Sequence, residues 1–536
     1  MWEKGWRQNT WNELDQEWDL LIIGGGITGA GIFRRAVEEG YRTLLVERSD
    51  FSSGTSSTSS KLIHGGIRYL RNKQFRLSQE SVREREWLLK EAKNLVTPLG
   101  FLMPYPRDPK IHAQFGVGVI IYDLLAPKWN HTHFSKSKLL QICPALESGW
   151  IRGGYFYYDA GMDDCRVVLR ILREGVMAGG IALNYTSAAA LLRSSEGKVC
   201  GAVLRDLSPH MLGEKEIKAK VVINATGPWS DEVRNQIGAS AKLRKLRGSH
   251  LVFPRARLNL PSAISLVNPQ DRRAMFAIPW EGVTLIGTTD LDHTDSITRH
   301  TPFTTQQEIE YILEFADSTF PTIGLGRKDI LSTFSGVRPV INTGAANPSK
   351  ESRAHAVWEE EGLITVTGGK FTTFRIMAEQ TLQKALPRLP FPADLSKRKR
   401  YFNRLPEIQS DALLPIEQFN YLLGRYGTEV TALLECALPG ENETILTTPN
   451  CWSELRWAAR TGAVEHLDDL LLRRVRIGLL LPNAAGSEMA RIRAIVQPEM
   501  GWSDARWDQE QQDYLSIYEN TFSPSPKGSL DIERTQ

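Results

Sequence analysis

The sequence has few cysteines and lacks the spacings by which cysteines hold a metal or a redox disulfide. Its five cysteines are scattered along 536 residues without a C-x-x-C pair: Cys143, Cys165, Cys200, Cys436 and Cys451. Five free thiols in a reducing compartment are the simplest account, and the pattern argues against an iron–sulfur cluster. His131 and His133 have no further ligands beside them, so no metal site is predicted.

Long apolar runs and a dominant charge are also absent. No apolar run approaches the roughly 18 residues that a membrane-spanning helix needs, and the polar N-terminus is not typical of a secretory signal. The 65 basic and 62 acidic residues give a net charge of +3. That balance does not suggest a nucleic-acid partner, although local basic faces could still meet acidic lipid. We therefore expect a cytoplasmic protein, or one attached to the inner face of the membrane.

The segment from Asp19 to Glu47 contains the principal motif. The apolar run Asp19 to Ile23 is long enough for one buried strand, and the turn Gly24-Gly25-Gly26-Ile27-Thr28-Gly29 follows it. A helix-like segment and a second apolar strand, Thr43 to Val46, then lead to Glu47. This is a G-x-G-x-x-G turn between a strand and a helix, with an acid about 20 residues further on.

Each part of this motif has a physical role in binding a dinucleotide. Gly24 permits a tight turn, Gly26 permits close approach of a pyrophosphate, and Gly29 permits close packing of helix on strand. The unpaired amides of the helix N-terminus attract the phosphates, and Glu47 is placed to accept hydrogen bonds from a ribose diol. The motif therefore predicts a dinucleotide site.

The residues after Glu47 favour FAD as the dinucleotide. A run of small hydroxyl residues and glycine, 52–60, leads directly into Lys61-Leu62-Ile63-His64-Gly65-Gly66. A Ser/Thr/Gly run is usually a flexible linker, but this one lies inside a domain. Small hydroxyl side chains and unhindered backbone N–H groups suit a loop that lies along the diphosphate of FAD and under its flat flavin ring.

With these residues in place, the sequence closely resembles the FAD-dependent glycerol-3-phosphate dehydrogenases. The resemblance extends in family order over residues 19–385, and the helical C-terminal portion resembles that family's C-terminal domain. The resembling segments are Gly24 to Gly31, Thr55 to Leu70, Asn224 to Trp229, Gly248-Ser249-His250, Ile286 to Asp290, Ser335 to Pro339 and Gly368 to Thr373.

The resemblance implies an α/β protein with a two-dinucleotide-binding (Rossmann-like) FAD domain, a β-rich substrate domain and an all-helical C-terminal domain. We expect an N-terminal arm over 1–18, an FAD-binding oxidoreductase domain over 19–390, a helical domain over 400–522 and a disordered tail over 523–536. Within the FAD-binding domain, the substrate part is interleaved at about 75–165 and 245–340.

Several helices and one hairpin are predicted from the spacing of apolar residues and from the glycines and prolines that end such segments. Helices are expected over 75–96, 161–178 and 467–481, and a hairpin is expected over 191–204. The four tryptophans of the arm are expected to pack on the domain surface, with a membrane-interface role as the alternative. The basic run 397–400 is expected to be a solvated linker, with lipid contact as the alternative.

The resemblance also implies which residues hold FAD. Small residues, backbone amides and a few polar side chains make up this set: Gly24, Gly26, Ile27, Thr28, Gly29, Glu47, Arg48, Thr55, Ser56, Ser59, Ser60, Leu62, His64, Gly65, Ala188, Ala225, Gly227, Gly369, Lys370, Phe371 and Thr372. Free amides after Gly368-Gly369 could stabilise negative charge on the reduced flavin if they face its pyrimidine edge.

The predicted substrate is sn-glycerol 3-phosphate. Three cations each lie beside a glycine-containing turn: Arg68, Arg338 and Lys370. A guanidinium group can bind two phosphate oxygens at once, and a lysine ammonium adds a compact positive charge, so this set suits a phosphate. The family implies that these cations bind the substrate, with Tyr69 and Thr289 as lesser contacts.

A lone histidine is more often structural, but the resemblance makes His250 the leading candidate for the general base at C2, since imidazole has a pKa near working pH. Arg338 is the second catalytic candidate, since it could polarise the substrate oxygen, and the division of roles between the two stays open. The predicted reaction is hydride transfer from C2 of the substrate to flavin N5, giving dihydroxyacetone phosphate.

The electron acceptor implied by the family is membrane quinone, which requires peripheral attachment to the membrane; a homodimer is a further option. An α-glycerophosphate oxidase that uses molecular oxygen is the first alternative. An amino-acid oxidase of the same superfamily is the second, and the phosphate-binding cations argue against it. A non-enzymatic flavin-binding protein is the third.

Overall fold

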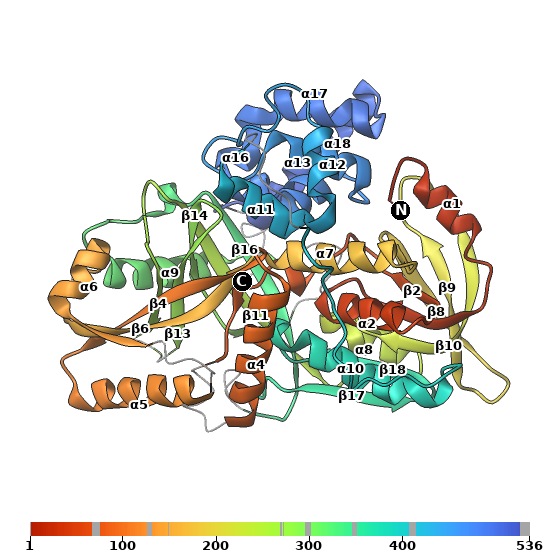
Figure 1. The fold of residues 1–536 in the computed structure, drawn as a ribbon, viewed down its shortest axis with the longest axis horizontal. Helices are drawn as coiled ribbons and strands as arrows, with labels where there is room; N and C mark the ends of the chain where they lie inside the picture. Colours follow the sequence, from red (N-terminus) through yellow and green to blue (C-terminus); the bar gives the residue numbers. More distant parts are fainter. Residues whose placement is uncertain are drawn as a thin grey trace, which may run out of the picture.

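The computed structural model describes residues 2–66, 75–125, 131–147, 149–268, 271, 273–294, 302–345, 351–406 and 414–525. Within these ranges the chain forms two large β-sheets side by side, and a group of C-terminal helices lies across their junction (Figure 1). The predicted fold class is confirmed: a Rossmann-like α/β part, a β-rich part and a helical C-terminal part.

The first sheet has a parallel core. Its strands lie in the order β17-β18-β10-β1-β2-β7, and every neighbouring pair is parallel except β17 with β18. The bounds are β1 Trp18–Ile23, β2 Thr43–Val46, β7 Ile181–Leu183, β10 Glu214–Asn224, β17 His355–Glu360 and β18 Leu363–Gly368. Because parallel strands end at one edge, the turns after β1, β2, β10 and β18 meet there.

Both faces of this sheet are covered, which explains its continuous apolar strands. On one face, α2 Ile27–Glu38 packs against α7 Asp164–Met177 and α10 Phe374–Ala385. On the other lies the hairpin of β8 Thr186–Arg193 and β9 Val199–Asp206, which pairs with the first half of β10.

The N-terminal arm is held between domains. Trp2, Trp11 and Trp18 are buried, and Arg7 of α1 Trp6–Asn12 donates hydrogen bonds to the backbone oxygen of Asn184 and to the carboxylate of Glu465. These three indoles are therefore not available to a membrane interface.

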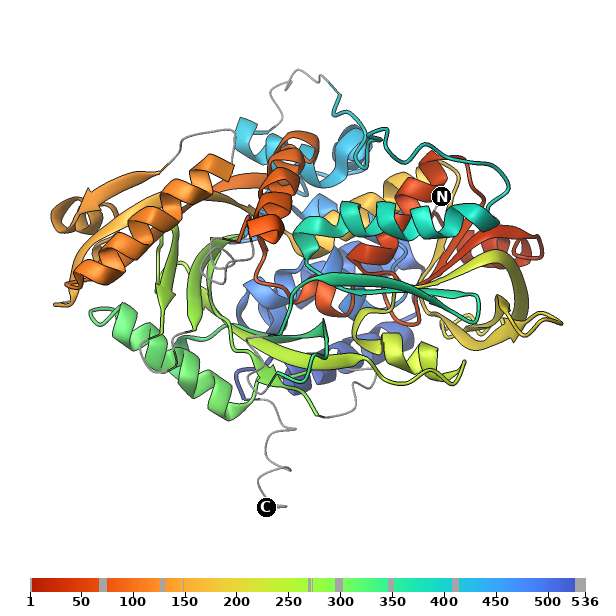
Figure 2. The same ribbon diagram turned by 90° about the horizontal axis from the view of Figure 1, so that it is seen from below.

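The second sheet has ten strands in the described part of the chain. Their order is β15-β11-β14-β13-β12-β4-β6-β3, with β16 paired to β11 and β5 paired to β6. The bounds are β3 Leu62–Ile63, β4 Val96–Pro106, β5 Thr132–Ser135, β6 Ile151–Met162, β11 Leu243–Pro254, β12 Ala263–Val267, β13 Ala274–Trp280, β14 Val283–Gly287, β15 Leu291–Asp292 and β16 Ser332–Ile341. Helices α6 Lys136–Ile142 and α9 Gln306–Thr319 pack on one face. Helix α5 Pro109–Leu125 and the C-terminal helices share a core with the other (Figure 2).

The C-terminal helices pack over both sheets. Their bounds are α11 Ile416–Tyr426, α12 Val430–Glu435, α13 Trp452–Thr461, α14 Leu467–Asp469, α15 Ile477–Leu480, α16 Pro482–Ala485, α17 Met489–Met500 and α18 Asp504–Ile517. Two apolar cores hold them, one shared with the ten-stranded sheet and one between α11, α12 and their neighbours.

Three predicted helices have other bounds in the structure. Helix α4 spans Phe75–Glu91, and Val96 instead begins β4 opposite Met162. Helix α7 begins at Asp164 rather than Gly161, because the Asp163 side chain caps it. The helix expected over 467–481 is broken, because Arg476 has a φ of 65°, between a π-helical turn and α15.

Candidate active site

The glycine turn lies at the edge where the parallel strands end. Gly24 follows β1 with a φ of 117°, and a Cβ there would lie 2.6 Å from the backbone oxygen of Ala225. A Cβ on Gly29 would lie 1.9 Å from the backbone oxygen of Gly24. Both positions therefore need glycine, because a side chain would separate α2 from the strands that it covers.

Glu47 follows β2 and faces the same turn. Its carboxylate accepts hydrogen bonds from the backbone N–H of Gly25, at 2.8 Å, and of Ser49, at 3.0 Å. Burial raises the pKa of Glu47, while the two N–H groups oppose the rise. The carboxylate thus supports the turn and also lines the cavity described next.

A cavity of about 500 Å³ extends from this turn to the ten-stranded sheet. Of the predicted FAD contacts, Gly29 and Gly65 do not line it. The following predicted contacts do line it: Gly24, Gly26, Ile27, Thr28, Glu47, Arg48, Thr55, Ser56, Ser59, Ser60, Leu62, His64, Ala188, Ala225, Gly227, Gly369, Lys370, Phe371 and Thr372. One continuous cavity therefore brings together segments that are more than 300 residues apart in the sequence.

A group of arginines lies at the sheet end of the cavity. Arg338 of β16 donates hydrogen bonds to the backbone oxygen of Thr289 and the carboxylate of Asp290, both at 3.2 Å, and to the hydroxyl of Thr288, at 2.9 Å. Arg353 donates to the other oxygen of Asp290, at 2.9 Å. Two guanidinium groups thus flank one carboxylate in the cavity wall, and guanidinium groups are suited to binding an anion.

Lys370 reaches the cavity from the turn after β18. Its Nζ donates to the hydroxyl of Ser81 on α4, at 2.6 Å. Burial lowers the pKa of Lys370 to about 7, and Glu80 only partly opposes it. Burial makes the charged form of Lys370 costly, and a phosphate bound beside the ammonium would stabilise that form.

Thr289 also lines the cavity, but its hydroxyl has other partners. It donates to Glu308, at 2.7 Å, and accepts from the backbone N–H of Ser249, at 2.9 Å. The predicted contacts Arg68 and Tyr69 lie outside the described residues.

His250 lies behind the cavity rather than in its wall. Its ring is 1% exposed, and Nε2 lies 2.9 Å from the hydroxyl of Ser60, which does line the cavity. The ring stacks on Phe334 at 4.8 Å between centroids. Burial, together with the charges of Arg338 and Lys61, holds the pKa of His250 well below its usual range. The imidazole is therefore neutral at neutral pH and could accept a proton.

Three residues near the cavity were not assigned from the sequence. Arg353 lies outside every motif, and the structure reveals it through its place in the cavity wall and its contact with Asp290. Asp290 and Lys61 both lie within motifs, but those motifs predict site roles for their neighbours: Thr289 beside Asp290, and Ser60 and Leu62 beside Lys61. Lys61 is fully buried and bonded to Asp164, a contact between segments 103 residues apart.

These residues fit FAD. Gly26 leaves open the space where a Cβ would lie 3.0 Å from the Ser56 hydroxyl, so a pyrophosphate can approach the start of α2. The cavity continues past Arg48, whose guanidinium lies 4.9 Å from the centroid of the Trp229 ring. The cavity extends from the glycine turn to Arg338 and Lys370, and its small polar and backbone groups suit a dinucleotide with an attached ring system.

Comparison with known proteins gives the same result. Residues 19–382 match the family model described as FAD dependent oxidoreductase, and residues 394–507 match the C-terminal domain of alpha-glycerophosphate oxidase. Glycerol-3-phosphate dehydrogenase 2 of Mycobacterium tuberculosis is 32% identical over 96% of this chain and 90% of its own. Aerobic glycerol-3-phosphate dehydrogenase of Staphylococcus epidermidis is 37% identical over 70% of this chain and 68% of its own.

A solved structure shows the same architecture. The glycerol-3-phosphate dehydrogenase of Bacillus halodurans, complexed with FAD, superposes with a TM-score of 0.76 at 26% identity, covering 97% of this chain and 98% of that one. The resemblance, the enzyme class and the cofactor predicted from the sequence are therefore confirmed. The chain belongs to the family of FAD-dependent glycerol-3-phosphate dehydrogenases.

Proposed function

We propose that this protein oxidises sn-glycerol 3-phosphate to dihydroxyacetone phosphate. The observation that carries this proposal is a single cavity lined both by the glycine turn and by Arg338, Arg353 and Lys370. The names of the relatives support the same substrate. FAD, when bound, supplies the two-electron acceptor.

The cations at the sheet end bind the phosphate in this proposal. Guanidinium forks match phosphate oxygens in pairs, and the Lys370 ammonium adds a point charge. Asp290 holds Arg338 and Arg353 in place without cancelling both charges. Arg68, Tyr69 and Thr289 stay predicted substrate contacts.

The proton of the substrate hydroxyl leaves through Ser60 and His250. Oxidation at C2 removes that proton, so an acceptor must lie within hydrogen-bond reach. Ser60 lines the cavity and is hydrogen-bonded to the His250 ring. A proton passed to Ser60 Oγ can therefore be matched by one passed from Oγ to Nε2, while Arg338 polarises the substrate oxygen.

The test is anaerobic mixing of the FAD-loaded protein with sn-glycerol 3-phosphate. We expect the oxidised flavin band to bleach with this ester and not with glycerol, because glycerol lacks the phosphate. Glycine serves as the substrate for the amino-acid oxidase alternative. An unbleached flavin with glycerol 3-phosphate would overturn the proposal, and bleaching with glycine alone would favour the alternative.

The electron acceptor in this proposal is membrane quinone. Reduction of a soluble quinone analogue should exceed peroxide release in air. Peroxide in proportion to substrate would instead support the α-glycerophosphate oxidase alternative.

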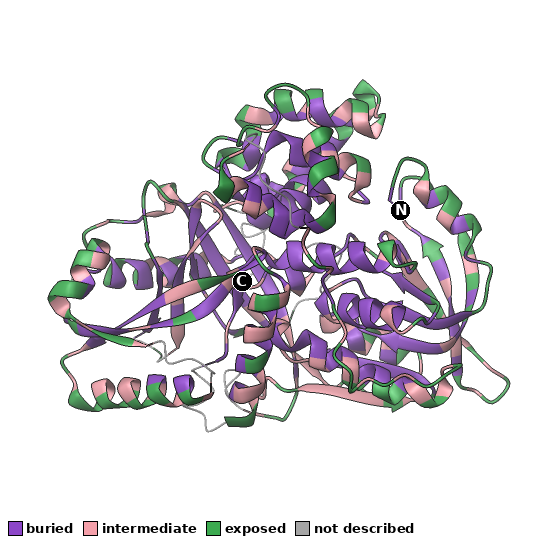
Figure 3. Cartoon of the chain, viewed as in Figure 1, coloured by how far each residue is buried: buried purple, intermediate pink, exposed green. Residues whose placement is uncertain are grey.

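Peripheral attachment to the inner face of the cytoplasmic membrane is the second part of this proposal. Among the described residues, no helix is both long and apolar enough to cross a membrane. Helix α5 packs against β4 and β6, exposes Val117 (57%), Ile120 (40%) and Leu124 (71%), and lies at the periphery of the molecule (Figures 1 and 3). An exposed apolar helix face of this kind suits the lipid interface.

Vesicle sedimentation tests this attachment. Val117→Glu with Leu124→Glu should abolish binding to phosphatidylethanolamine–phosphatidylglycerol vesicles. Met211→Glu is the matched control, because Met211 is exposed and apolar but lies at the turn after β9. Equal binding by both variants would show that α5 is not the attachment site.

A homodimer stays a prediction, for which sedimentation velocity is the measurement.

A further inference from the structure

The loop that lines the cavity over 55–61 is held from behind by buried ions. Lys61 is fully buried, and its Nζ donates to both carboxylate oxygens of Asp164, at 2.9 and 2.8 Å, and to the backbone oxygen of Ser57, at 2.5 Å. Asp164 also accepts from the backbone N–H and hydroxyl of Ser59. This one carboxylate therefore fixes the loop at two residues, Ser59 and Lys61.

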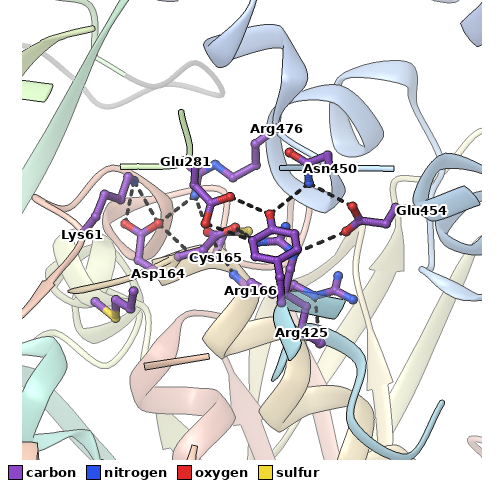
Figure 4. A network of polar contacts seen from close by, with 12 residues as sticks. Lys61, Asp164, Cys165, Arg166, Glu281, Arg425, Asn450, Glu454 and Arg476 are labelled. Carbon is purple, nitrogen blue, oxygen red and sulfur yellow. Dashed lines mark hydrogen bonds and ion pairs between the residues drawn. The ribbon is translucent and has the colours of Figure 1, made fainter. Parts of the chain in front are cut away.

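The C-terminal domain contributes to the same support. Arg476 donates to the carboxylates of Asp163, at 2.9 Å, and Asp164, at 2.7 Å, and to the backbone oxygen of Ser57, at 2.8 Å. Figure 4 shows Lys61, Asp164 and Arg476 together at one end of a buried network that continues to Glu454. A residue more than 400 positions from Ser57 in the sequence therefore holds the loop beside the glycine turn.

The backbone at both cations supports a special role for these contacts. Lys61 has a φ of 59° and Arg476 has a φ of 65°. Non-glycine residues pay a conformational cost in this region and keep it where the surrounding contacts enforce it. At both residues the side chain makes buried ion contacts that hold it in place.

Lys61 is also close to the His250 ring. Its Nζ lies 4.7 Å from the centroid of the Phe334 ring, and that ring stacks on His250. Ser60, the hydrogen-bond partner of His250, is the residue before Lys61. A buried positive charge at this place disfavours a second positive charge on the imidazole.

Other charged groups lie near His250 in the described part of the chain. Arg338 approaches from β16, and Glu308 of α9 bonds the neighbouring Ser249. Gly287 of β14 lies opposite His250, and α15 brings no charged side chain. Lys61 and Arg338 are therefore the cations that act on the ring, and Arg338 is already assigned to the substrate.

We propose that Lys61 is a positioning residue for the redox site, and that Asp164 and Arg476 make the C-terminal domain part of its support. Lys61 fixes the FAD-facing loop over 55–61, and its charge keeps the His250 ring neutral so that the ring can take a proton from Ser60. The second role rests on the function proposed above, whereas the first requires only that FAD binds.

The experiment compares Lys61→Met and Lys61→Arg with the unaltered holoenzyme. Lys61→Met should move the acid limb of the kcat/KM profile to higher pH by about one unit, since His250 loses a neighbouring positive charge. Lys61→Arg keeps the charge and should restore the limb. FAD affinity, measured by reconstitution of the apoprotein, should fall about tenfold in Lys61→Met because the loop loses its anchor.

Arg173→Met is the matched control. Arg173 of α7 pairs with Glu429 of the C-terminal domain at 2.6 Å, across the same domain junction. This ion pair does not involve the loop over 55–61. Its replacement should lower the melting temperature and leave both the acid limb and the FAD affinity unchanged.

A second variant keeps the test decisive if Lys61→Met does not fold. Arg476→Gln leaves the Asp163 and Asp164 charges less compensated, which should move the acid limb in the same direction and weaken FAD binding. An acid limb and FAD affinity equal to those of the unaltered enzyme, in a folded Lys61→Met or Arg476→Gln protein, would overturn the inference. If the unaltered enzyme binds FAD but is not reduced by glycerol 3-phosphate, the proposed function fails, and the FAD affinities alone decide whether Lys61 supports the loop.

Discussion

At the scale of single residues, Lys370 binds the substrate phosphate in the proposed function, so its charge sets the pH range of that binding. Burial lowers the pKa of this ammonium to about 7. It is therefore charged below about pH 7 and loses its charge as the pH rises through that value. A phosphate monoester becomes a dianion above about pH 6, so both partners carry full charge only over a narrow range.

We expect kcat/KM for glycerol 3-phosphate to decline above about pH 7. Lys370→Met should reduce kcat/KM by roughly tenfold to a hundredfold at pH 6.5, because a hydrogen bond to a charged group is lost. It should also remove the decline, since no titrating ammonium is left. Lys370→Arg stays charged over the whole range and serves as the comparison. If kcat/KM still declines above about pH 7 in Lys370→Met, the decline comes from the titration of another group.

At the scale of elements, the position of α2 on β1 depends on one missing side chain. A Cβ on Gly29 would meet the backbone oxygen of Gly24 at 1.9 Å, which no rotamer can relieve. Gly29→Ala must therefore move the start of α2 away from the turn, and overpacking of this kind costs about 1–3 kcal/mol.

We expect Gly29→Ala to weaken FAD binding by at least about tenfold, as measured by reconstitution of the apoprotein. Gly118→Ala in α5 is the control, because a Cβ there meets no atom within 4 Å. Equal FAD affinities in the two variants would show that the turn adapts.

At the scale of the whole molecule, the junction between the domains contains a carboxyl group whose ionisation opposes folding. Glu281, in the turn between β13 and β14, accepts a hydrogen bond from Tyr421 of α11, at 2.5 Å. Burial raises the pKa of Glu281 to about 7, against the lowering effect of Arg425. Because the folded pKa is above the unfolded value, its stabilising contribution is complete below about pH 4.5 and is lost as the pH rises through about 7.

We expect the unfolding free energy of the holoprotein to fall between about pH 5 and pH 8 through this group, by a few kcal/mol at most. Glu281→Gln should flatten that dependence, as measured by thermal unfolding at both pH values. Glu361→Gln is the control, because its carboxylate is 53% exposed. A slope equal to that of the unaltered protein in Glu281→Gln would exclude Glu281 as its source.

The parts predicted well from the sequence are those whose signals are local. The strand, turn and helix from Trp18 to Glu38 follow from an apolar run and glycines, and the hairpin of β8 and β9 follows from alternation around a polar turn. The parts missed depend on distant contacts. The break falls at Arg476 itself, which is neither glycine nor proline, and its guanidinium is bonded to Asp163 and Asp164, more than 300 residues earlier in the sequence.

The amino-acid sequence by itself determined the FAD-binding turn, the fold class and the types of residue that would meet a phosphate, because glycine spacing and apolar periodicity act over short stretches of chain. Only the tertiary structure decided that His250 reaches the cavity through Ser60, that Arg353 joins Arg338 at Asp290, and that the C-terminal domain touches the loop beside the flavin site. These contacts join residues tens to hundreds of positions apart. Their geometry is therefore set by how the sheets and helices pack, which no local pattern encodes.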